Sequence, residues 1–233
     1  MTYDAKDYLD AFIRTLARKE ELKKLDVHYY FTGDPFPSDI LPELQKFENL
    51  EDLRLPESRI TQKELNRLDK CRFEKCLHFR MPLVDTKEQG EKLVKALPNI
   101  FPKLESLHFE DINTDNCSFT EKCSELVAKL NLKKFRMRLH EDSNMDTMKE
   151  IIEKVVPGLS KLYLNSLSVN KDSHSEILAK SMAAGKNIEE LVLINESPVQ
   201  KYECNFDNDK LKDLFIDRLT SHYESLTAWL EKN

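Results

Sequence analysis

The sequence predicts an α/β solenoid with a parallel inner sheet of about seven strands and helices on the outside. Three observations predict it. A short apolar motif recurs seven times, its copies follow one another at nearly constant spacing, and the copies are followed by segments with the apolar periodicity of a helix. One strand and one helix of this length cannot bury their apolar faces alone, so successive units must stack. We expect a single domain over residues 1–233.

The motif reads L-x-x-L-x-L, and its last three positions alternate apolar, polar, apolar, which is typical of a half-buried strand. The third copy is irregular, because Leu77-His-Phe79 follows a displaced Phe73. The central residues are spaced 28, 24, 30, 28, 27 and 29 positions apart. In order they are Leu25, Leu53, Leu77, Leu107, Phe135, Leu162 and Leu191.

Helices are expected between the strands, because apolar residues recur there at i, i+3 and i+4. Two starts carry capping boxes, Thr61-Gln-Lys-Glu64 and Thr86-Lys-Glu-Gln89. Further starts are expected at Ser38, Thr120, Asn144 and Ser173.

Both ends of a solenoid expose its core, so terminal caps are expected. Residues 4–20 predict an amphipathic capping helix, the repeats occupy residues 22–195, and residues 208–232, with the only tryptophan at Trp229, predict a closing helix. The loops at 28–37 and 195–207 are longer than the repeat requires. Each is expected either to carry function or to cover the core.

The strand motif, the helical second half and the repeat length resemble the ribonuclease-inhibitor-like class of leucine-rich repeats over roughly residues 20–195. The resemblance implies a horseshoe-shaped leucine-rich-repeat solenoid. That class usually carries Asn five positions after the central residue. This chain instead has Tyr30, Ser58, Pro82, Ile112, His140, Leu167 and Glu196. The repeats are therefore divergent, and no subfamily is assigned.

Polar residues that alternate with the buried motif positions are expected to face the concavity. Neighbouring strands lie ~4.8 Å apart, so these residues form columns. The main column is expected to consist of Asp26, Arg54, His78, His108, Arg136, Tyr163 and Val192. Guanidinium and ammonium groups bind carboxylates and phosphates, which predicts a site for an acidic segment of a protein partner. The predicted binding residues are Arg54, His78, Arg80, His108, Lys134, Arg136, Arg138, Lys161 and Tyr163. The alternative is a solvated face balanced by nearby acids such as Asp52, Glu110 and Glu190.

No catalytic residue, cofactor or metal is expected. The four glycines are isolated, and the chain lacks a P-loop, G-x-G-x-x-G, H-E-x-x-H and G-x-S-x-G. His78 and His108 are metal-binding residue types, but zinc needs about four ligands and only Cys76 can be added.

Net charge and cysteine content limit the partners and the cellular compartment that can be expected. A net charge of −6 argues against general binding to nucleic acid or membranes. No apolar run approaches the ~18 residues of a membrane span, and the start of the chain lacks the pattern of a signal peptide. The five cysteines lack paired spacing. We therefore expect a monomeric protein of the cytoplasm, or of the nucleus.

Protein–protein interaction is the expected function, and two alternatives stay open. One is an inhibitor or regulator that occludes an enzyme. The other follows from a resemblance of the repeats to those of F-box proteins and of innate-immune nucleotide-binding receptors, and it implies the substrate-recognition part of a ubiquitin-ligase or receptor assembly. Neither an F-box helix set nor a nucleotide-binding domain is recognised in this sequence, so a stand-alone adaptor and a fragment of a larger protein are both open.

Overall fold

The computed structural model describes residues 21–26, 41–55, 59–81, 83–84, 86–110, 121–139, 153–166, 185–195, 210 and 212–217. Several predicted features lie outside these residues. They are the helix at 4–20, the loop at 28–37, nearly all of the loop at 195–207, and the helix starts at Ser38, Thr120, Asn144 and Ser173.

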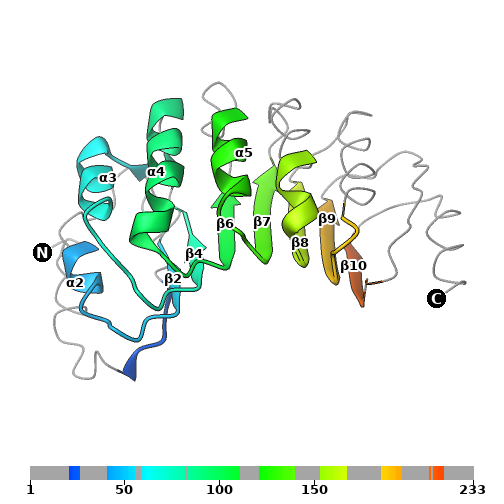
Figure 1. The fold of residues 1–233 in the computed structure, drawn as a ribbon, viewed down its shortest axis with the longest axis horizontal. Coiled ribbons are helices and arrows are strands. Elements are labelled where there is room, and N and C mark those ends of the chain that lie inside the picture. Colours follow the sequence, from blue (N-terminus) through cyan, green and yellow to red (C-terminus); the bar gives the residue numbers. More distant parts are fainter. Residues whose placement is uncertain are drawn as a thin grey trace, which may run out of the picture.

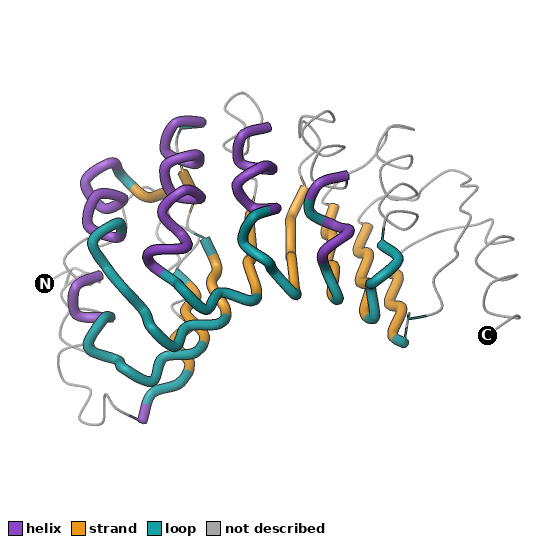
Figure 2. Tube along the Cα trace, viewed as in Figure 1, coloured by secondary structure: helices purple, strands orange, loops and turns teal. Residues whose placement is uncertain are grey.

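The described residues form one open parallel sheet of eight strands, which follow one another across the sheet in chain order. Figures 1 and 2 show the strands as a row beneath the helices. The strands are β1 (Lys24–Asp26), β2 (Asp52–Arg54), β4 (His78–Arg80), β6 (Ser106–Glu110), β7 (Lys134–Leu139), β8 (Lys161–Ser166), β9 (Glu190–Asn195) and β10 (Asp213–Asp217). The predicted parallel sheet is confirmed, and within the described residues it has one strand more than the expected seven.

The helices lie on one side of this sheet, along the upper row of Figure 1. They are α2 (Leu41–Leu44), α3 (Gln62–Leu68), α4 (Lys87–Ile100), α5 (Glu121–Ala128) and the short 3-10 helix η2 (Val156–Gly158). Helices α3 and α4 begin at the predicted capping boxes, because each N-cap threonine and its N3 residue bond each other's backbone N–H. A second, unpredicted sheet pairs β3 (Arg59–Ile60) with β5 (Leu83–Val84).

The central residues of the motif form one row across the sheet. Their Cα atoms are register partners from strand to strand, and those from β1 to β9 are buried. The row consists of Leu25, Leu53, Phe79, Leu107, Phe135, Leu162, Leu191 and Leu214. Its aromatic members extend into the core, where the Phe79 and Phe101 ring centroids lie 4.3 Å apart.

The predicted centre of the third copy, Leu77, is wrong by two residues. Phe79 is the register partner of both Leu53 and Leu107, while Cys76 is fully buried at the position of the first leucine. The copy therefore reads Cys-x-x-Phe-x-Met, ending at the buried Met81. With this correction the centres from Leu25 to Leu191 are spaced 28, 26, 28, 28, 27 and 29 residues apart, which is more even than predicted.

The start of each strand is joined to the preceding unit by main-chain hydrogen bonds. Six carbonyl oxygens each accept two consecutive backbone N–H groups from the next unit, over N–O distances of 2.7 to 3.2 Å. These junction carbonyls belong to Lys23, Glu51, Leu77, Glu105, Lys133 and Ser160. The stacking register is therefore set largely by backbone atoms, two residues before each central position.

The predicted helix over 208–232 is wrong at its start, because β10 occupies residues 213–217. Leu214 and Ile216 are register partners of Leu191 and Leu193 on β9. The sequence from Leu211 reads Leu-x-x-Leu-x-Ile, an eighth copy of the motif that a helical apolar stripe obscured. The rest of the predicted helix, from residue 218, lies outside the described residues.

Candidate functional site

Two columns of side chains flank the buried central row and point away from the core, because residues alternate between the faces of a strand. The upstream column precedes the central residues and consists, from β1 to β9, of Lys24, Asp52, His78, Ser106, Lys134, Lys161 and Glu190. The downstream column follows them and consists of Asp26, Arg54, Arg80, His108, Arg136, Tyr163 and Val192. Together these residues form the open face of the sheet.

The structure corrects the predicted place of one histidine. His78 was expected beside Arg54 and His108 in one column, but it is the register partner of Asp52 and Ser106 in the upstream column. The position next to His108 that was predicted for His78 is occupied by Arg80. The error follows from the misplaced centre of the third copy, since a shift of two residues moves a side chain along the strand while keeping its face.

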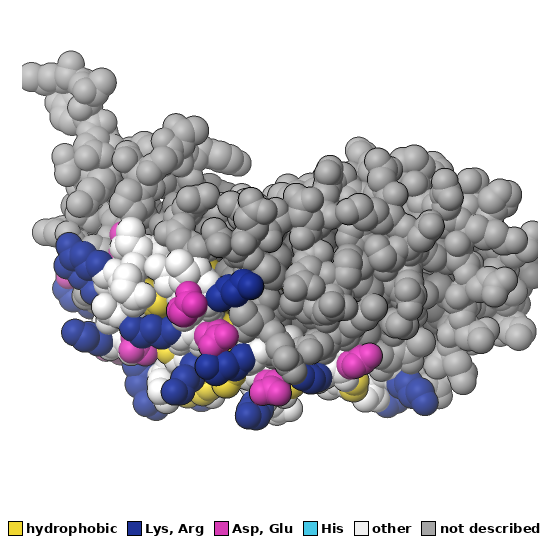
Figure 3. Space-filling view, turned by 90° about the horizontal axis from the view of Figure 1, so that it is seen from above, with side chains coloured by type: hydrophobic (Ala, Val, Ile, Leu, Met, Phe, Trp, Pro, Cys, Tyr) yellow, Lys and Arg dark blue, Asp and Glu magenta, His cyan; other side chains and the backbone are white. Residues whose placement is uncertain are grey.

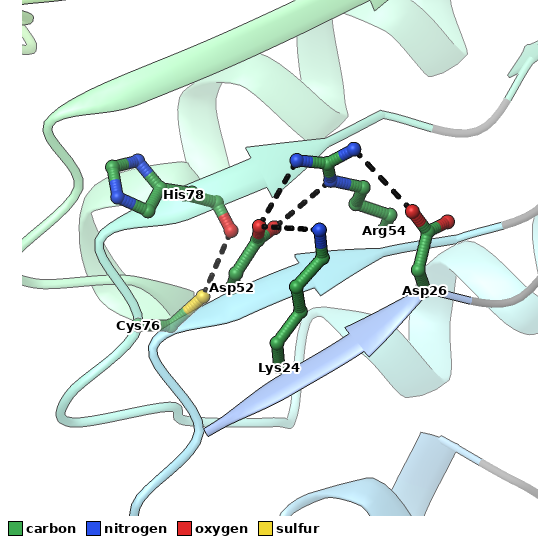
Figure 4. Close-up of polar contacts among 6 residues, drawn as sticks. All are labelled: Lys24, Asp26, Asp52, Arg54, Cys76 and His78. Carbon is green, nitrogen blue, oxygen red and sulfur yellow. Dashed lines mark hydrogen bonds and ion pairs between the residues drawn. The ribbon is translucent and has the colours of Figure 1, made fainter.

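An ion cluster occupies the β1–β2 end of the open face (Figure 4). The Arg54 guanidinium donates to both carboxylate oxygens of Asp52, at 3.2 and 3.1 Å, and to Asp26 on the neighbouring strand at 3.3 Å. The Lys24 ammonium lies 3.8 Å from Asp52. The bonds from Asp52 raise the pKa of Arg54. This end of the face therefore balances its own charges, and Arg54 is held by acids of the same chain.

A second cluster occupies the β7–β9 end. Lys161 Nζ lies 2.7 Å from Glu190 Oε2, the Tyr163 hydroxyl donates to Glu190 Oε1, and Lys134 Nζ lies 4.2 Å from the centroid of the Tyr163 ring. Hydrogen bonds from Lys161 and Tyr163 lower the pKa of Glu190. Burial lowers the pKa of Lys134, and the nearby Lys161 adds to this effect. Lys161 is thus partnered by Glu190, and Lys134 rests on an aromatic ring.

Between the two clusters lies the central zone, which we define as the open-face residues of the three adjacent strands β4, β6 and β7. These residues are His78, Ser106, Lys134, Arg80, His108 and Arg136. None of the six carries a carboxylate, and the nearest acid along these strands is Glu110, which follows His108 by two residues on β6 and is the register partner of Arg138. Arg80 is buried, with 8% of its surface exposed, whereas His78 and Arg136 are exposed.

The pKa of His108 depends on the charged side chains of the central zone. Its pKa is lowered to about 3, first by burial and then by the positive charges of Arg136, Arg80, Arg54 and Lys134. Near pH 7 the imidazole is therefore neutral, and four cationic side chains act on it together. Three of the predicted cations, Arg80, Lys134 and Arg136, thus lie on the three central strands, and their positive charges act on His108.

The structure places Arg138, another of the predicted binding residues, only along its strand. Arg138 lies on β7 as the register partner of Glu110 and Asn165, one step beyond the downstream column. Its side chain lies outside the described part of the structure.

Cys76 was considered as a metal ligand together with His78 and His108, but its thiol lies in the core. Its thiol is fully buried and lies 3.2 Å from the carbonyl oxygen of His78, and burial raises its pKa to about 12. Figure 4 shows the His78 imidazole turned away from this sulfur. Within the described residues, no group of three or more His, Cys, Asp or Glu side chains is arranged to hold a metal ion.

The helical side of the molecule carries a different charge pattern. Seen from above in Figure 3, basic and acidic side chains alternate over the described part. Ion pairs join neighbouring units there, such as Lys122 with Glu91 at 2.7 Å and Lys154 with Glu125 at 3.7 Å.

In the part of the chain that the structure describes, no helix is long and apolar enough to cross a bilayer. No protein-family model matches the chain, and no curated protein matches it.

Proposed function

We propose that the chain is a leucine-rich-repeat solenoid that binds an acidic segment of a protein partner on its open face, which forms the concave side of the solenoid. The stacking of motif copies in register and the helical layer on one side support the solenoid. Repeat proteins of this kind present an extended inner surface that suits recognition of a macromolecule.

The observation that carries the binding role is that Arg80, Lys134 and Arg136 lie on the three central strands and their positive charges, with that of Arg54, act on His108. Arg136 is exposed and offers a planar guanidinium, which binds carboxylates through two parallel hydrogen bonds. Arg80 lies beneath as a buried charge, so it strengthens the field more than it contacts a ligand.

A protein segment fits this site better than a nucleic acid does. The whole chain carries a net charge of −6, and the central zone is bounded by Asp52 on β2 and by Glu190 on β9. A long polyanion that crossed the sheet would meet these acids on both sides, which disfavours a nucleic acid.

The test compares two charge reversals. Arg136→Glu changes the central zone, and Lys95→Glu makes a matched change at an exposed position of α4. We expect the partner captured by the native protein to bind Arg136→Glu at least about tenfold more weakly, a difference of about 1.4 kcal/mol, and to bind Lys95→Glu unchanged. Quantitative mass spectrometry of parallel captures identifies the partner, and calorimetry with the purified partner measures the loss.

Equal binding of the partner by Arg136→Glu and the native protein would contradict the proposed site. Arg54→Glu is a poorer probe, because it would place a third carboxylate against Asp26 and Asp52 and disturb the strands themselves. An activity assay on the captured partner then separates an adaptor from an inhibitor that acts by occlusion.

A further inference from the structure

We infer that side chains of β7 and β8 form a subsite for one carboxylate, which Glu190 of β9 fills in the free protein and which an acidic side chain of the partner takes over on binding. The subsite consists of Lys134, Lys161 and Tyr163. This inference rests on the proposed function and adds its regulation, because Glu190 then competes with the partner from within the same chain.

The subsite and its internal occupant lie on three adjacent strands. Lys134, Lys161 and Glu190 are register partners in the upstream column. Tyr163 is two residues further along β8, so its side chain faces the same side of the sheet. Two ammonium-bearing residues are therefore neighbours at one strand spacing of about 5 Å. A carboxylate beside them relieves their mutual repulsion.

The contacts of Glu190 show what the subsite offers to a carboxylate. Each of its oxygens has a donor, because the Lys161 ammonium lies 2.7 Å from Oε2 and the Tyr163 hydroxyl donates to Oε1. The Lys134 ammonium, placed over the Tyr163 ring, adds a favourable charge interaction with Glu190. These contacts lower the pKa of Glu190 and so favour its ionised form. All the donors belong to β7 and β8, so a carboxylate of another chain can satisfy them equally.

The internal carboxylate can be exchanged. The Glu190 side chain keeps 23% of its surface exposed, and the Lys161 side chain keeps 46%. Ion pairs that are exposed to this degree contribute little net free energy, because water solvates the separated charges well. A carboxylate of the partner therefore replaces an interaction of similar strength. The apparent affinity for the partner is lowered by the fraction of molecules in which Glu190 fills the subsite.

The neighbours of the subsite set the side from which an acidic segment arrives. On the β6 side, the register partner of Lys134 is the uncharged Ser106. On the β10 side, the register partner of Glu190 is a second acid, Asp213. The acid of β6, Glu110, lies four residues beyond Ser106 along its strand. We expect the segment to reach the subsite across the start of β6 and β7, away from the acids of β9 and β10.

Removal of the internal carboxylate tests the inference. Glu190→Gln keeps the shape of the side chain and an oxygen for the Tyr163 hydroxyl, but it loses the charge that holds Lys161. The probe is hexaglutamate with blocked ends, and its affinity for the full chain is measured by NMR titration at low salt. We expect Glu190→Gln to bind the probe about three- to fivefold more tightly than the native protein does, which corresponds to one exposed ion pair. No gain in affinity would overturn the inference.

Glu189→Gln is the matched control. Glu189 is the preceding residue and holds Lys212 at 3.0 Å, so its substitution makes the same change of net charge in the same unit and leaves the subsite intact. We expect this variant to bind hexaglutamate as the native protein does. An equal gain in both variants would assign the effect to net charge and contradict the inference.

A second substitution separates competition from simple repulsion by Glu190. In the native protein, Lys161→Gln removes a donor and its internal competitor together, whereas in the Glu190→Gln background it removes the donor alone. We therefore expect Lys161→Gln to weaken the binding of hexaglutamate more strongly in the Glu190→Gln background. Equal losses in both backgrounds would show that Glu190 only repels the probe, and the internal competition would be wrong.

The outcomes separate this inference from the proposed function. If Glu190→Gln gains no affinity while Arg136→Glu still loses the captured partner, the internal competition is wrong and the acidic-segment site stands. If Glu190→Gln gains affinity while Arg136→Glu captures the partner as the native protein does, the subsite binds carboxylates and the proposed site around Arg136 is wrong.

Discussion

Lys134 lies against the face of the Tyr163 ring on the adjacent strand, with its Nζ atom 4.2 Å from the ring centroid. The same ring carries the hydroxyl that donates to Glu190, which in turn bonds Lys161. One aromatic side chain therefore holds two charged groups of the open face in place.

The two contacts of Tyr163 can be separated by substitution. Tyr163→Phe removes the hydroxyl and keeps the ring, so the pKa of Glu190 should rise, while Tyr163→Leu also removes the cation–π contact. We expect Tyr163→Leu to lower the free energy of unfolding by about 0.5 to 1 kcal/mol more than Tyr163→Phe does. Urea unfolding measures the difference, and equal values for both variants would show that the ring contact contributes nothing.

His108 should make the protein less stable in mild acid. Its pKa is about 3 in the folded state against 6.5 for the ordinary side chain, so the unfolded chain takes up the proton more readily. The stability from keeping this ring neutral is fully present above pH 6.5 and is lost as the pH falls toward 3. By about pH 5 the loss from this group is about 2 kcal/mol.

The measurement compares unfolding free energies of the native protein and His108→Gln between neutral pH and about pH 5. We expect a shallower pH dependence in the variant, whatever its stability at neutral pH. Carboxylates titrate in both proteins and cancel in the difference, so parallel curves would contradict the proposed origin.

Two buried thiols should resist alkylation in the folded protein. Burial raises the pKa of Cys71 to about 11 and that of Cys76 to about 12, so hardly any thiolate is present near pH 8. We expect iodoacetamide to modify both cysteines at least about a hundredfold more slowly than in guanidinium chloride. Peptide mapping by mass spectrometry follows each site, and rapid labelling of Cys76 would place its thiol outside the core.

Asn131 is expected to tolerate glycine better than alanine. Its φ angle is 52°, a left-handed conformation that favours Gly and Asn, and its side chain is exposed between α5 and β7. Asn131→Ala should cost about 1 kcal/mol of stability, whereas Asn131→Gly should be nearly neutral. Thermal unfolding of the two variants checks the order, and an alanine variant as stable as the glycine variant would argue against backbone strain here.

The parallel sheet could be predicted because its signal repeats. Each copy of the motif is weak alone, but Leu25, Leu53, Leu107 and their successors share one spacing, and stacking is the arrangement that buries them all. The capping boxes at Thr61 and Thr86 could be predicted because they depend on contacts within four residues. Local and periodic features were therefore readable from the sequence.

The register of the third copy could not be read in the same way. Cys76, Phe79 and Met81 fill the three anchor positions without a leucine, and Leu77 between them resembles the consensus better than they do. Only pairing with Leu53 and Leu107 distinguishes the two choices, and that is a tertiary property. For β10, apolar residues at Leu211, Leu214 and Phe215 fit a helical period as well as a strand, and pairing with β9 decides between them.

The sequence predicted which residues line the candidate site better than it predicted how their side chains pair. The alternation of the strands placed Arg54 and Arg136 on the open face. It did not show that Arg54 is held by two acids or that His108 is buried enough to stay neutral, because both depend on side-chain geometry across strands. The balanced charges at the β1–β2 end and the neutral imidazole of His108 follow from these contacts.

The six junction carbonyls have a consequence for how this surface can vary. Backbone atoms join each unit to the next, so the outward side chain beside each junction takes no part in those bonds. The same repeated geometry therefore carries side chains of different chemistry in the upstream column, such as Asp52, His78, Ser106 and Lys134. Point substitutions at outward positions that make no ion pair across strands can thus change the charge of the surface while the main-chain bonds between units stay the same. At such positions surface charge and scaffold can vary independently of each other.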